Sequence, residues 1–311
     1  MIWQRKHILG LENLSKEEIS HILQTAKPMK EVLQRPLKKL PTLRGKSVMH
    51  LFYEASTRTR TSFETAGKIL GADTASIAIA QSSISKGESL LDTARTIAAM
   101  KVDLVVIRHA ASGAAAFLTE YLQAGIINAG DGQHEHPTQA LLDMFTMQEE
   151  FGDLAGKKVV IVGDILHSRV ARSNVWGLTK MGAEVTLVGP PTLLPPEMKV
   201  LGVKMSHNLD RELEGADVVM ALRLQLERQQ SGLFPSLREY SRLYGLSSQK
   251  LQKTGKKTIV LHPGPMNRGV EISSELADSP MAKIEEQVTN GVAVRMALIY
   301  LLAGGTSNVM A

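Results

Sequence analysis

The sequence contains no cysteine, which excludes a disulfide framework and thiol chemistry. Aromatic residues make up only 4% of the 311 residues, and no basic run is interleaved with them, so stacking platforms for single-stranded nucleic acid are not expected. No apolar run approaches the roughly 18 residues that a membrane-spanning helix needs, and residues 1–7 lack the apolar core of a secretory signal. These absences predict a cytoplasmic protein with neither a membrane nor a nucleic acid as partner.

The composition is that of an ordinary globular protein, with 43% apolar and 22% charged residues, and the length allows two domains. Basic residues exceed acidic ones by 36 to 31, which gives a net charge of +5. This excess is compatible with nucleic-acid binding, with anionic substrates or with a solvated basic surface. The solvated surface is the favoured interpretation for most of these charges.

Apolar strand-like runs alternate with helix-like runs along the chain, which is typical of βαβ units with a parallel sheet. The expected strands are 47–52, 74–80, 103–107 and 126–128, and then 158–162, 184–188, 203–206, 217–221 and 258–261. Three helices are expected from their start signals: a capping box at 15–18, the segment after residue 56, and residue 137. Three more helices are expected over 86–100, 113–123 and 281–302. The sequence therefore predicts an α/β fold of two domains, 1–150 and 151–280, each a mostly parallel sheet flanked by helices.

Hydroxyl and guanidinium groups follow the strand at 47–52, at the start of a helix-like run: Ser56, Thr57, Arg58 and Thr59. The first N–H groups of a helix have no partner within it, and the helix dipole is positive there, so this junction can bind an anion. The planar fork of an arginine suits a phosphate better than a lysine does. The alternative is plain capping, with a later helix start in a capping box at 61–64. We expect the earlier start, but the motif alone favours phosphate binding and capping equally.

Two further cations come after strands of the first domain, where ligands bind in open α/β sheets. Lys86 lies in a hydroxyl-rich loop, 81–88, that could close over a phosphate or a carboxylate. Arg108 directly follows the strand at 103–107 and could be a second guanidinium for the same anion. Taken alone, each is more typical of an ordinary surface position.

His136 precedes a proline, which is favoured at the first position of a helix. The dipole at that helix start favours a neutral ring, which can donate a hydrogen bond to a polarised carbonyl oxygen. Gln139 lies one turn further and could share the same side of the helix. A metal site made of His134, His136 and Asp131 is disfavoured, because a third strong ligand at a recognisable spacing is missing.

In the second domain, residues 162–169 occupy the place of a dinucleotide fingerprint but hold one glycine where three are needed. Dinucleotide binding is therefore disfavoured. Arg169 stands at a helix start, where the helix dipole repels a cation. Binding of an external anion and plain exposure to solvent explain an arginine at this position equally well. Arg223 and Gln225 alternate with leucines and would share one side of an extended segment, although an amphipathic surface segment fits at least as well.

A proline-rich turn, 262–268, follows the last expected strand. It is compatible with a cis bond between Gly264 and Pro265, since cis bonds occur almost only before proline. Carbonyl oxygens freed in such a turn could accept hydrogen bonds from a substrate amino group. A rigid surface turn is the safer interpretation of this motif alone.

Taken together, these separated motifs resemble the catalytic chains of the aspartate carbamoyltransferase family, over essentially the whole length of the chain. The matching segments are 56–61, 108–109, 136–139, 223–225 and 262–265, in that order. The resemblance implies transfer of the carbamoyl group from carbamoyl phosphate to the amino group of L-aspartate in de novo pyrimidine (UMP) biosynthesis. The products are N-carbamoyl-L-aspartate and phosphate, and neither a cofactor nor a metal is needed.

The resemblance also implies roles for individual residues. The phosphate cradle would be Ser56, Thr57, Arg58, Thr59 and Arg108. The carbonyl oxygen would contact Thr59, Arg108 and His136, and the carbamoyl amide would contact Gln139. The aspartate carboxylates would bind Arg169, Arg223 and Gln225, and the carbonyls of Gly264 and Pro265 would orient the two amino groups.

For the assembly, the resemblance implies a homotrimer in which Ser82 and Lys86 reach the active site of a neighbouring subunit. The C-terminal segment 281–311 would pack back on the first domain. Residues 266–271 resemble a bacterial branch of the family whose subunits need not bind regulatory chains. An assembly of two trimers with regulatory chains or with dihydroorotase therefore stays open. Gly264 stands where a larger apolar residue is common, but that position acts through its backbone.

Two alternatives remain. An ornithine carbamoyltransferase shares the 56–60 element, but it reads a cationic substrate with an acidic group and a Ser-Met-Gly loop, where this chain has Arg223-Leu224-Gln225. The basic pI of about 9.3 also permits a non-catalytic protein that binds anions or nucleic acid.

Overall fold

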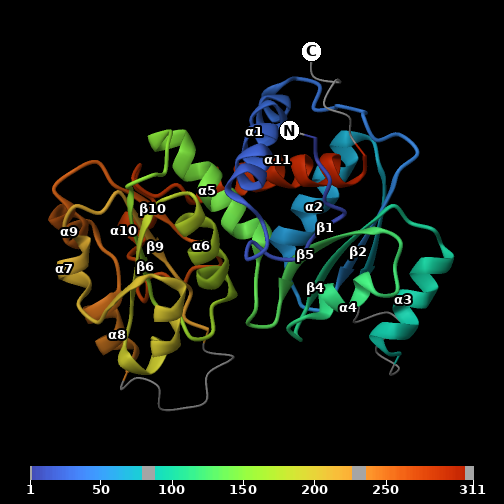
Figure 1. The fold of residues 1–311 in the computed structure, drawn as a ribbon. Helices are drawn as coiled ribbons and strands as arrows, with labels where there is room; N and C mark the ends of the chain where they lie inside the picture. The colour runs from blue at the N-terminus through green and yellow to red at the C-terminus, as the bar shows by residue number, and fades with distance from the viewer. Residues whose placement is uncertain (1, 79–87, 226–235, 305–311) are drawn as a thin grey trace. The chain divides into compact units, whose positions relative to one another are not determined.

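The computed structural model describes residues 2–78, 88–225 and 236–304. It divides into two compact units (Figure 1): unit 1 is made of residues 1–142 with 288–311, and unit 2 of residues 143–287. The chain passes from unit 1 to unit 2 within α5 (Pro137–Phe151) and returns within α11 (Ile284–Leu302). Ser82 and Lys86, which are expected to reach the active site of a neighbouring subunit, lie outside the described part of the chain.

The sheet of unit 1 is entirely parallel. Its strands are β1 (His7–Ile8), β2 (Ser47–Phe52), β3 (Asp73–Ala78), β4 (Leu104–His109) and β5 (Gly125–Asp131). They lie in the order β1-β5-β4-β2-β3. The chain builds outward from β2 to β3 and then crosses to β4 on the other side of β2. That reversal between β2 and β4 is the kind of switch point at which open α/β sheets bind ligands.

The sheet of unit 2 has the same plan. Its strands are β6 (Lys158–Val162), β7 (Glu184–Val188), β8 (Lys204–Ser206), β9 (Val218–Ala221) and β10 (Ile259–Leu261). They are parallel and lie in the order β10-β9-β6-β7-β8, so the reversal falls between β6 and β9. The α/β prediction of mostly parallel sheets flanked by helices is confirmed.

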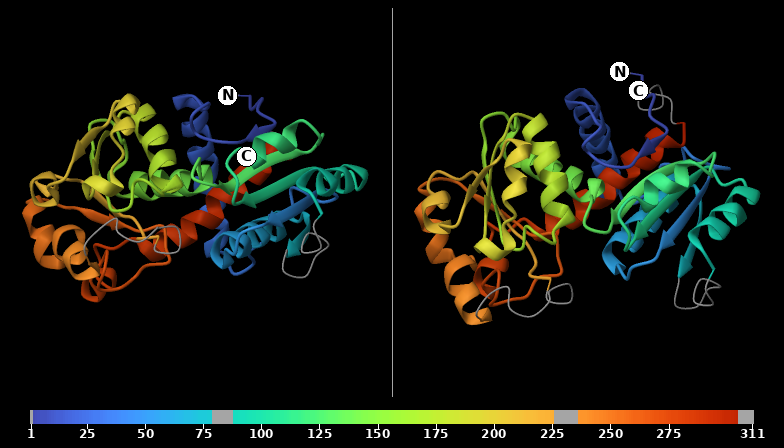
Figure 2. Two further views of the ribbon diagram at one scale, coloured as in Figure 1. Left: turned by 90° about the horizontal axis from the view of Figure 1, so that it is seen from below. Right: turned by 60° about the horizontal axis from the view of Figure 1, so that its bottom comes forward.

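Helices flank both sheets (Figure 2). In unit 1 they are α1 (Lys16–Gln34), α2 (Thr57–Leu70), α3 (Leu90–Ala99), α4 (Ala114–Thr119) and most of α11. In unit 2 they are α6 (Arg169–Lys180), α7 (Leu209–Leu213), α8 (Leu237–Tyr244), α9 (Ser248–Leu251) and α10 (Ser274–Ala277). Three 3-10 turns, Pro191–Leu193, Pro196–Leu201 and Gln252–Thr254, complete unit 2 within the described residues.

The two sides of the unit 1 sheet carry different helices because successive side chains of a strand point to opposite sides. From β2, Met49 and Leu51 enter an apolar cluster with α3 and α4. His50, between them, points to the other side, where its ring lies 6.3 Å from the ring of Phe63 on α2. In unit 2, α7 to α10 pack in one cluster against β6, β9 and β10.

The C-terminal helix α11 is attached to α2 within unit 1. The guanidinium of Arg295 is buried, donates to Ser62 Oγ at 2.9 Å and lies 5.1 Å from the ring centre of Phe63. A buried arginine that stacks on an aromatic ring and donates a hydrogen bond keeps its charge satisfied. This contact holds α2 against α11.

The helix starts predicted from sequence are partly confirmed. The capping box of α1 is present, and α2 begins early with Ser56 at the N-cap, so the alternative start at residue 61 is wrong. The helix expected over 113–123 ends at Thr119, and the last helix begins at Ile284, three residues later than expected. The strand β1 and the short helices between residues 237 and 277 were not predicted, because elements of two to eight residues show little periodicity.

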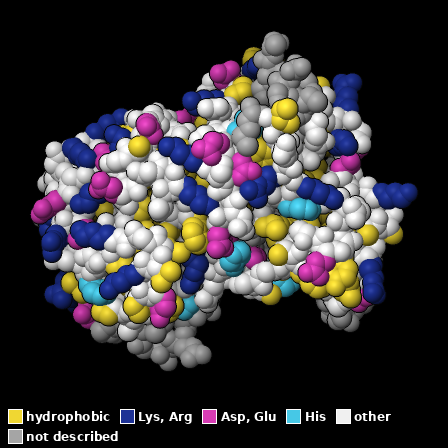
Figure 3. Space-filling model, viewed as in Figure 1, with side chains coloured by type: hydrophobic (Ala, Val, Ile, Leu, Met, Phe, Trp, Pro, Cys, Tyr) yellow, Lys and Arg dark blue, Asp and Glu magenta, His cyan; other side chains and the backbone are white. Residues whose placement is uncertain are grey.

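The net positive charge does not gather into one stripe on the surface drawn in Figure 3. There, Lys and Arg side chains are interspersed with Asp and Glu. Among the described residues, every helix is too short or too polar to cross a bilayer.

The buried His50 should make unit 1 less stable in acid. Burial lowers its pKa from 6.5 to about 4, against the opposing charge of Glu64. Between pH 6.5 and about pH 4, His50 therefore binds a proton in the unfolded chain but stays neutral in the folded protein. Stability should fall with decreasing pH in this window, by up to about 1.4 kcal/mol per pH unit.

Urea unfolding of the wild type and of His50→Gln across this pH window measures the effect. The variant should lose less stability on acidification than the wild type. Parallel pH dependences of the two proteins would contradict the assignment.

Candidate active site

In unit 1 the candidate residues lie at or after the ends of three neighbouring strands, β5, β4 and β2. Arg108, expected to follow its strand, is instead the second-last residue of β4. Backbone hydrogen bonds join the ends of these strands: Tyr53 N–H donates to Arg108 O at 2.8 Å, and Gly132 N–H donates to His109 O at 2.9 Å. Since the carboxyl ends of parallel strands lie at one edge of a sheet, the segments after residues 52, 109 and 131 come together there.

The start of α2 is open to a ligand. Ser56 is the N-cap, but within the described part of the chain its side chain makes no capping hydrogen bond to the helix. The first turn also lacks an acidic residue. Thr57 and Arg58 are exposed, whereas Thr59 is buried. The N–H groups and the positive end of the dipole are therefore not neutralised by an acid of that turn.

Arg108 and His136 lie together at the next strand end. Arg108 Nη1 is 3.5 Å from Nε2 of His136 and 3.4 Å from the carbonyl oxygen of Ala129. Its Nε is 3.3 Å from Oε2 of Glu54, in a pair with little solvent exposure. The carboxylate balances part of the guanidinium charge, and an incoming anion would compete with it. Gln139 is buried one turn into α5, and its N–H donates to the carbonyl oxygen of His136.

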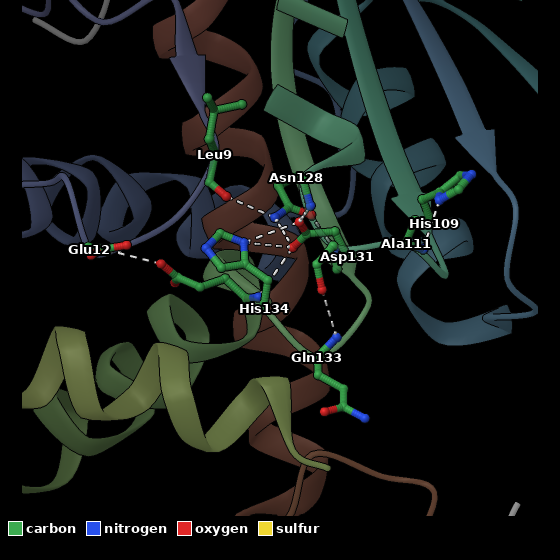
Figure 4. A network of polar contacts seen from close by, with 12 residues as sticks. Leu9, Glu12, His109, Ala111, Asn128, Asp131, Gln133 and His134 are labelled. Carbon is green, nitrogen blue, oxygen red and sulfur yellow. Dashed lines mark hydrogen bonds and ion pairs between the residues drawn. The ribbon is translucent and has the colours of Figure 1, made fainter. Parts of the chain in front are cut away.

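A buried aspartate shapes the loop that presents His136 (Figure 4). The Asp131 carboxylate accepts from Asn128 Nδ2 at 2.7 Å, as Figure 4 shows. It also accepts from Gly113 N–H at 2.7 Å and from Glu135 N–H at 3.2 Å. His134 Nδ1 lies 3.1 Å from its Oδ2.

The environment of this aspartate explains two opposite pKa shifts. Burial alone would raise the pKa of Asp131, but the hydrogen bonds from His134, Asn128 and Gly113 outweigh it and the pKa is lowered. The hydrogen bond to Asp131 raises the pKa of His134, although burial opposes it. Both shifts favour an ion pair that stiffens the loop before His136.

The possible metal ligands differ from those considered from sequence. In the described residues, Glu12, His134 and Glu135 each place a ligand atom within 4.8 Å of the other two, and His136 is not among them. Glu135, however, already accepts from Leu11 N–H at 2.8 Å and from Glu12 N–H at 3.1 Å. A Cβ at Gly10 would collide with this buried carboxyl group. Glu135 therefore has a structural explanation, namely holding the segment after β1.

In unit 2 the candidate residues again follow three neighbouring strands, β10, β9 and β6. After β6, the buried Asp164 accepts from the N–H of His167 at 3.2 Å and lies 2.9 Å from its Nδ1. Ser168 caps α6 through its Oγ, and Arg169 is the first residue of that helix, as predicted. Arg169 is buried although the dipole repels a cation at this end.

The segment after β9 runs beside the start of α6. Leu222 N–H donates to Val162 O at 2.8 Å, and Gln225 Nε2 donates to His167 O at 3.3 Å. The leucines of 222–225 are buried while Arg223 and Gln225 are half-buried, which agrees with the expected alternation. The structure thus brings Gln225 next to the segment that ends in Arg169.

The turn after β10 contains the cis bond between Gly264 and Pro265 that its sequence permits. Gly264 is half-buried, Pro265 is exposed, and Gly264 N–H donates to Nδ1 of His262 at 2.9 Å. Sequence reasoning did not single out Glu54, Asp164, His167 or Glu271, since each is one ionisable residue without a spacing rule. Their only signal is position, immediately after or near a strand end.

The two halves of the chain match two family models. The model described as "Aspartate/ornithine carbamoyltransferase, carbamoyl-P binding domain" matches residues 6–149. The model described as "Aspartate/ornithine carbamoyltransferase, Asp/Orn binding domain" matches residues 155–302.

Named relatives and solved structures agree with these models. The aspartate carbamoyltransferase catalytic subunit of Desulfitobacterium hafniense is 70% identical over 305 residues, 98% of each chain. Aspartate transcarbamoylase from Trypanosoma cruzi, solved with carbamoyl phosphate and aspartate, superposes with a TM-score of 0.86 at 30% identity, covering 96% of this chain and 97% of that one. Ornithine carbamoyltransferase from Pyrococcus furiosus superposes with a TM-score of 0.87 at 27% identity, covering 99% and 100%.

Unit 1 should bind inorganic phosphate through Arg108. Replacing it, Arg108→Met, removes a charge-assisted hydrogen-bond donor worth about 1.5–3 kcal/mol, so the dissociation constant should rise about tenfold to a hundredfold. Isothermal titration calorimetry measures this change.

Arg95→Met is the matched control, because Arg95 is on α3 with its side chain 70% exposed. It should bind phosphate as the wild type does. Equal affinities of all three proteins would remove Arg108 from the anion site.

Proposed function

This chain belongs to the aspartate/ornithine carbamoyltransferase family, and we propose that it transfers the carbamoyl group of carbamoyl phosphate to the amino group of L-aspartate. The products are N-carbamoyl-L-aspartate and phosphate, and the reaction serves de novo pyrimidine biosynthesis. The relative at 70% identity over 98% of both chains, an aspartate carbamoyltransferase catalytic subunit, supports this choice of substrate. The overall fold does not discriminate, because the aspartate and ornithine enzymes superpose about equally well.

The observation that carries the choice of aspartate lies in unit 2. Arg223 and Gln225 both lie in the segment after β9, and Gln225 donates to His167 O just before α6, where Arg169 is the first helical residue. Two guanidiniums suit the two carboxylates of aspartate, since each can bind a carboxylate with two parallel hydrogen bonds. The same groups would repel the cationic side chain of ornithine.

Unit 1 takes carbamoyl phosphate in this proposal. The hydroxyls and guanidinium at the start of α2, from Ser56 to Thr59, hold the phosphate together with Arg108. Arg108 also contacts the carbonyl oxygen, with Thr59 and His136. The 3.5 Å between Arg108 and His136 supports this sharing, because one oxygen atom can contact both groups. Gln139 holds the carbamoyl amide.

The chemistry then follows from where charge develops. The aspartate amine attacks the carbonyl carbon, and negative charge grows on the carbonyl oxygen as the C–N bond forms. Donors already in place at that oxygen stabilise this charge, and losing one typically costs about 2.7–4 kcal/mol of barrier. The C–O bond to phosphate then breaks, and the phosphate leaves with its charge held by Arg58 and Arg108. It also takes the proton from the amine, since no side chain here is an obvious base.

Holding both substrates in one geometry supplies much of the remaining acceleration. In unit 2, Arg169, Arg223 and Gln225 bind the aspartate, and the carbonyl oxygens of Gly264 and Pro265 accept from the two amino groups. Substitution of a residue that holds either substrate should therefore lower kcat/KM, whichever unit it belongs to.

The proposed assembly is a homotrimer in the cytoplasm, in which Ser82 and Lys86 complete the site of a neighbouring subunit. Both residues lie outside the described part of the chain, and their roles rest on the family resemblance. Sedimentation should give three times the chain mass of 33.9 kDa. A monomer that is fully active would contradict the shared site.

The substrate assignment has a direct test. With carbamoyl phosphate as donor, colorimetric detection of the ureido product should show turnover of L-aspartate and none of L-ornithine. Turnover of ornithine alone would reverse the assignment. Absence of both activities, with tight and salt-sensitive binding to an oligonucleotide, would favour a nucleic-acid binder instead.

Arg223 should contribute to aspartate binding and not to phosphate binding. Arg223→Met should raise KM for aspartate about tenfold or more, because a charge-assisted hydrogen bond is lost. Its inhibition by inorganic phosphate should match that of the wild type. Arg238→Met, at an exposed position on α8, is the control and should leave both constants unchanged. An unchanged KM in Arg223→Met would remove this residue from the site.

A further inference from the structure

His262, the residue after β10, is held firmly at the end of the strand. Its backbone N–H donates to Oε1 of Gln287 at 2.9 Å, and Nε2 of Gln287 donates to Oδ1 of Asp143 at 2.7 Å. Asp143 also accepts from Asn174 Nδ2 at 2.8 Å. All four side chains are buried, so this network fixes where the turn 263–267 begins.

Both ring nitrogens of His262 bond to the segment that follows. Nδ1 accepts from the N–H of Gly264 at 2.9 Å, and Nε2 lies 3.2 Å from Oε1 of Glu271. An N–H donates only to a lone pair, so the Gly264 contact places the ring proton on Nε2. Nε2 then donates to Glu271, and the ring links the beginning of the turn to its far end.

Glu271 completes the link from the other side. Its Oε1 accepts from His262 and also from the N–H of Asn267. Its Oε2 has no hydrogen-bond partner among the described residues, although the side chain is only 2% exposed. A buried carboxylate with an unpaired oxygen carries a desolvation cost that an apolar side chain would avoid. We therefore attribute the presence of an acid at this position to its Oε1, which accepts hydrogen bonds from both His262 and Asn267.

The geometry points to His262 and Glu271 as positioning residues, which hold residues 264–267 so that the carbonyl oxygens of Gly264 and Pro265 meet the substrate amino groups. Both side chains are buried and act through the backbone N–H groups of Gly264 and Asn267. The inference rests on the proposed function, in which those two carbonyl oxygens orient the substrates. It assigns roles to two residues for which the family resemblance implied none.

Paired substitutions separate the hydrogen bonds from the packing. Glu271→Gln keeps an amide oxygen that can accept from both His262 and Asn267, whereas Glu271→Leu keeps only the bulk. His262→Asn keeps an acceptor for Gly264, whereas His262→Leu removes both ring contacts. Glu275→Leu, at an exposed position on α10 in the same unit, is the matched control.

The experiment measures kcat and KM for both substrates, inhibition by inorganic phosphate, and thermal unfolding. Glu271→Leu and His262→Leu should lower kcat/KM for aspartate about tenfold or more, as expected for the loss of a buried hydrogen bond. Glu271→Gln should recover most of this loss, and Glu275→Leu should match the wild type. Phosphate inhibition should stay within about twofold of the wild type, because the residues that hold phosphate belong to unit 1.

The outcomes are distinct. If the wild type turns over aspartate and the two leucine variants have the same kcat/KM as the wild type, only the positioning role is overturned. Parallel losses of kcat/KM, phosphate affinity and thermal stability that Glu271→Gln does not recover would also overturn it, because these indicate general unfolding. If His262→Leu does not fold, the comparison of Glu271→Gln with Glu271→Leu decides. A wild type without aspartate turnover would overturn the proposed function, and this inference with it.

Discussion

The parallel pairing of the strands is the constraint on which the rest of the structure depends. In a parallel sheet every carboxyl end lies at the same edge, so residues that are far apart in sequence leave the sheet side by side. In unit 1 the order β5-β4-β2 brings together the segments after residues 131, 109 and 52. In unit 2 the order β10-β9-β6 does the same after residues 261, 221 and 162. The groups proposed to bind anions therefore gather at these edges.

Buried carboxylates paired with histidines recur at these strand ends. Asp131 pairs with His134, Asp164 with His167, and Glu271 with His262. Each carboxylate also accepts at least one backbone N–H of the adjoining loop. A loop that leaves a strand has backbone groups without ladder partners, and a buried acid satisfies several of them at once. These acids thus give rigid shape to irregular segments that carry the proposed site residues.

Substrate choice does not follow from the fold. Solved enzymes for aspartate and for ornithine superpose about equally well on this chain. The difference must come from side chains at a few positions, and the proposed function assigns it in unit 2 to Arg223 and Gln225, in the segment that contacts His167. A guanidinium and a carboxylate form two directed hydrogen bonds, whereas two cations repel, so one segment can change the preferred substrate without changing the sheet.

The sequence by itself determined the α/β class, the strands that carry the proposed site, the early start of the helix at Ser56, and the motifs that mark the family. These features are local, because periodicity, capping residues and motif spacing are read within a short window. Only the tertiary structure decided which strands are neighbours, that β1 joins β5, and that His262 contacts both Gly264 and Glu271. Such contacts join residues whose meeting depends on the folded path of the chain, so no spacing in the sequence announces them.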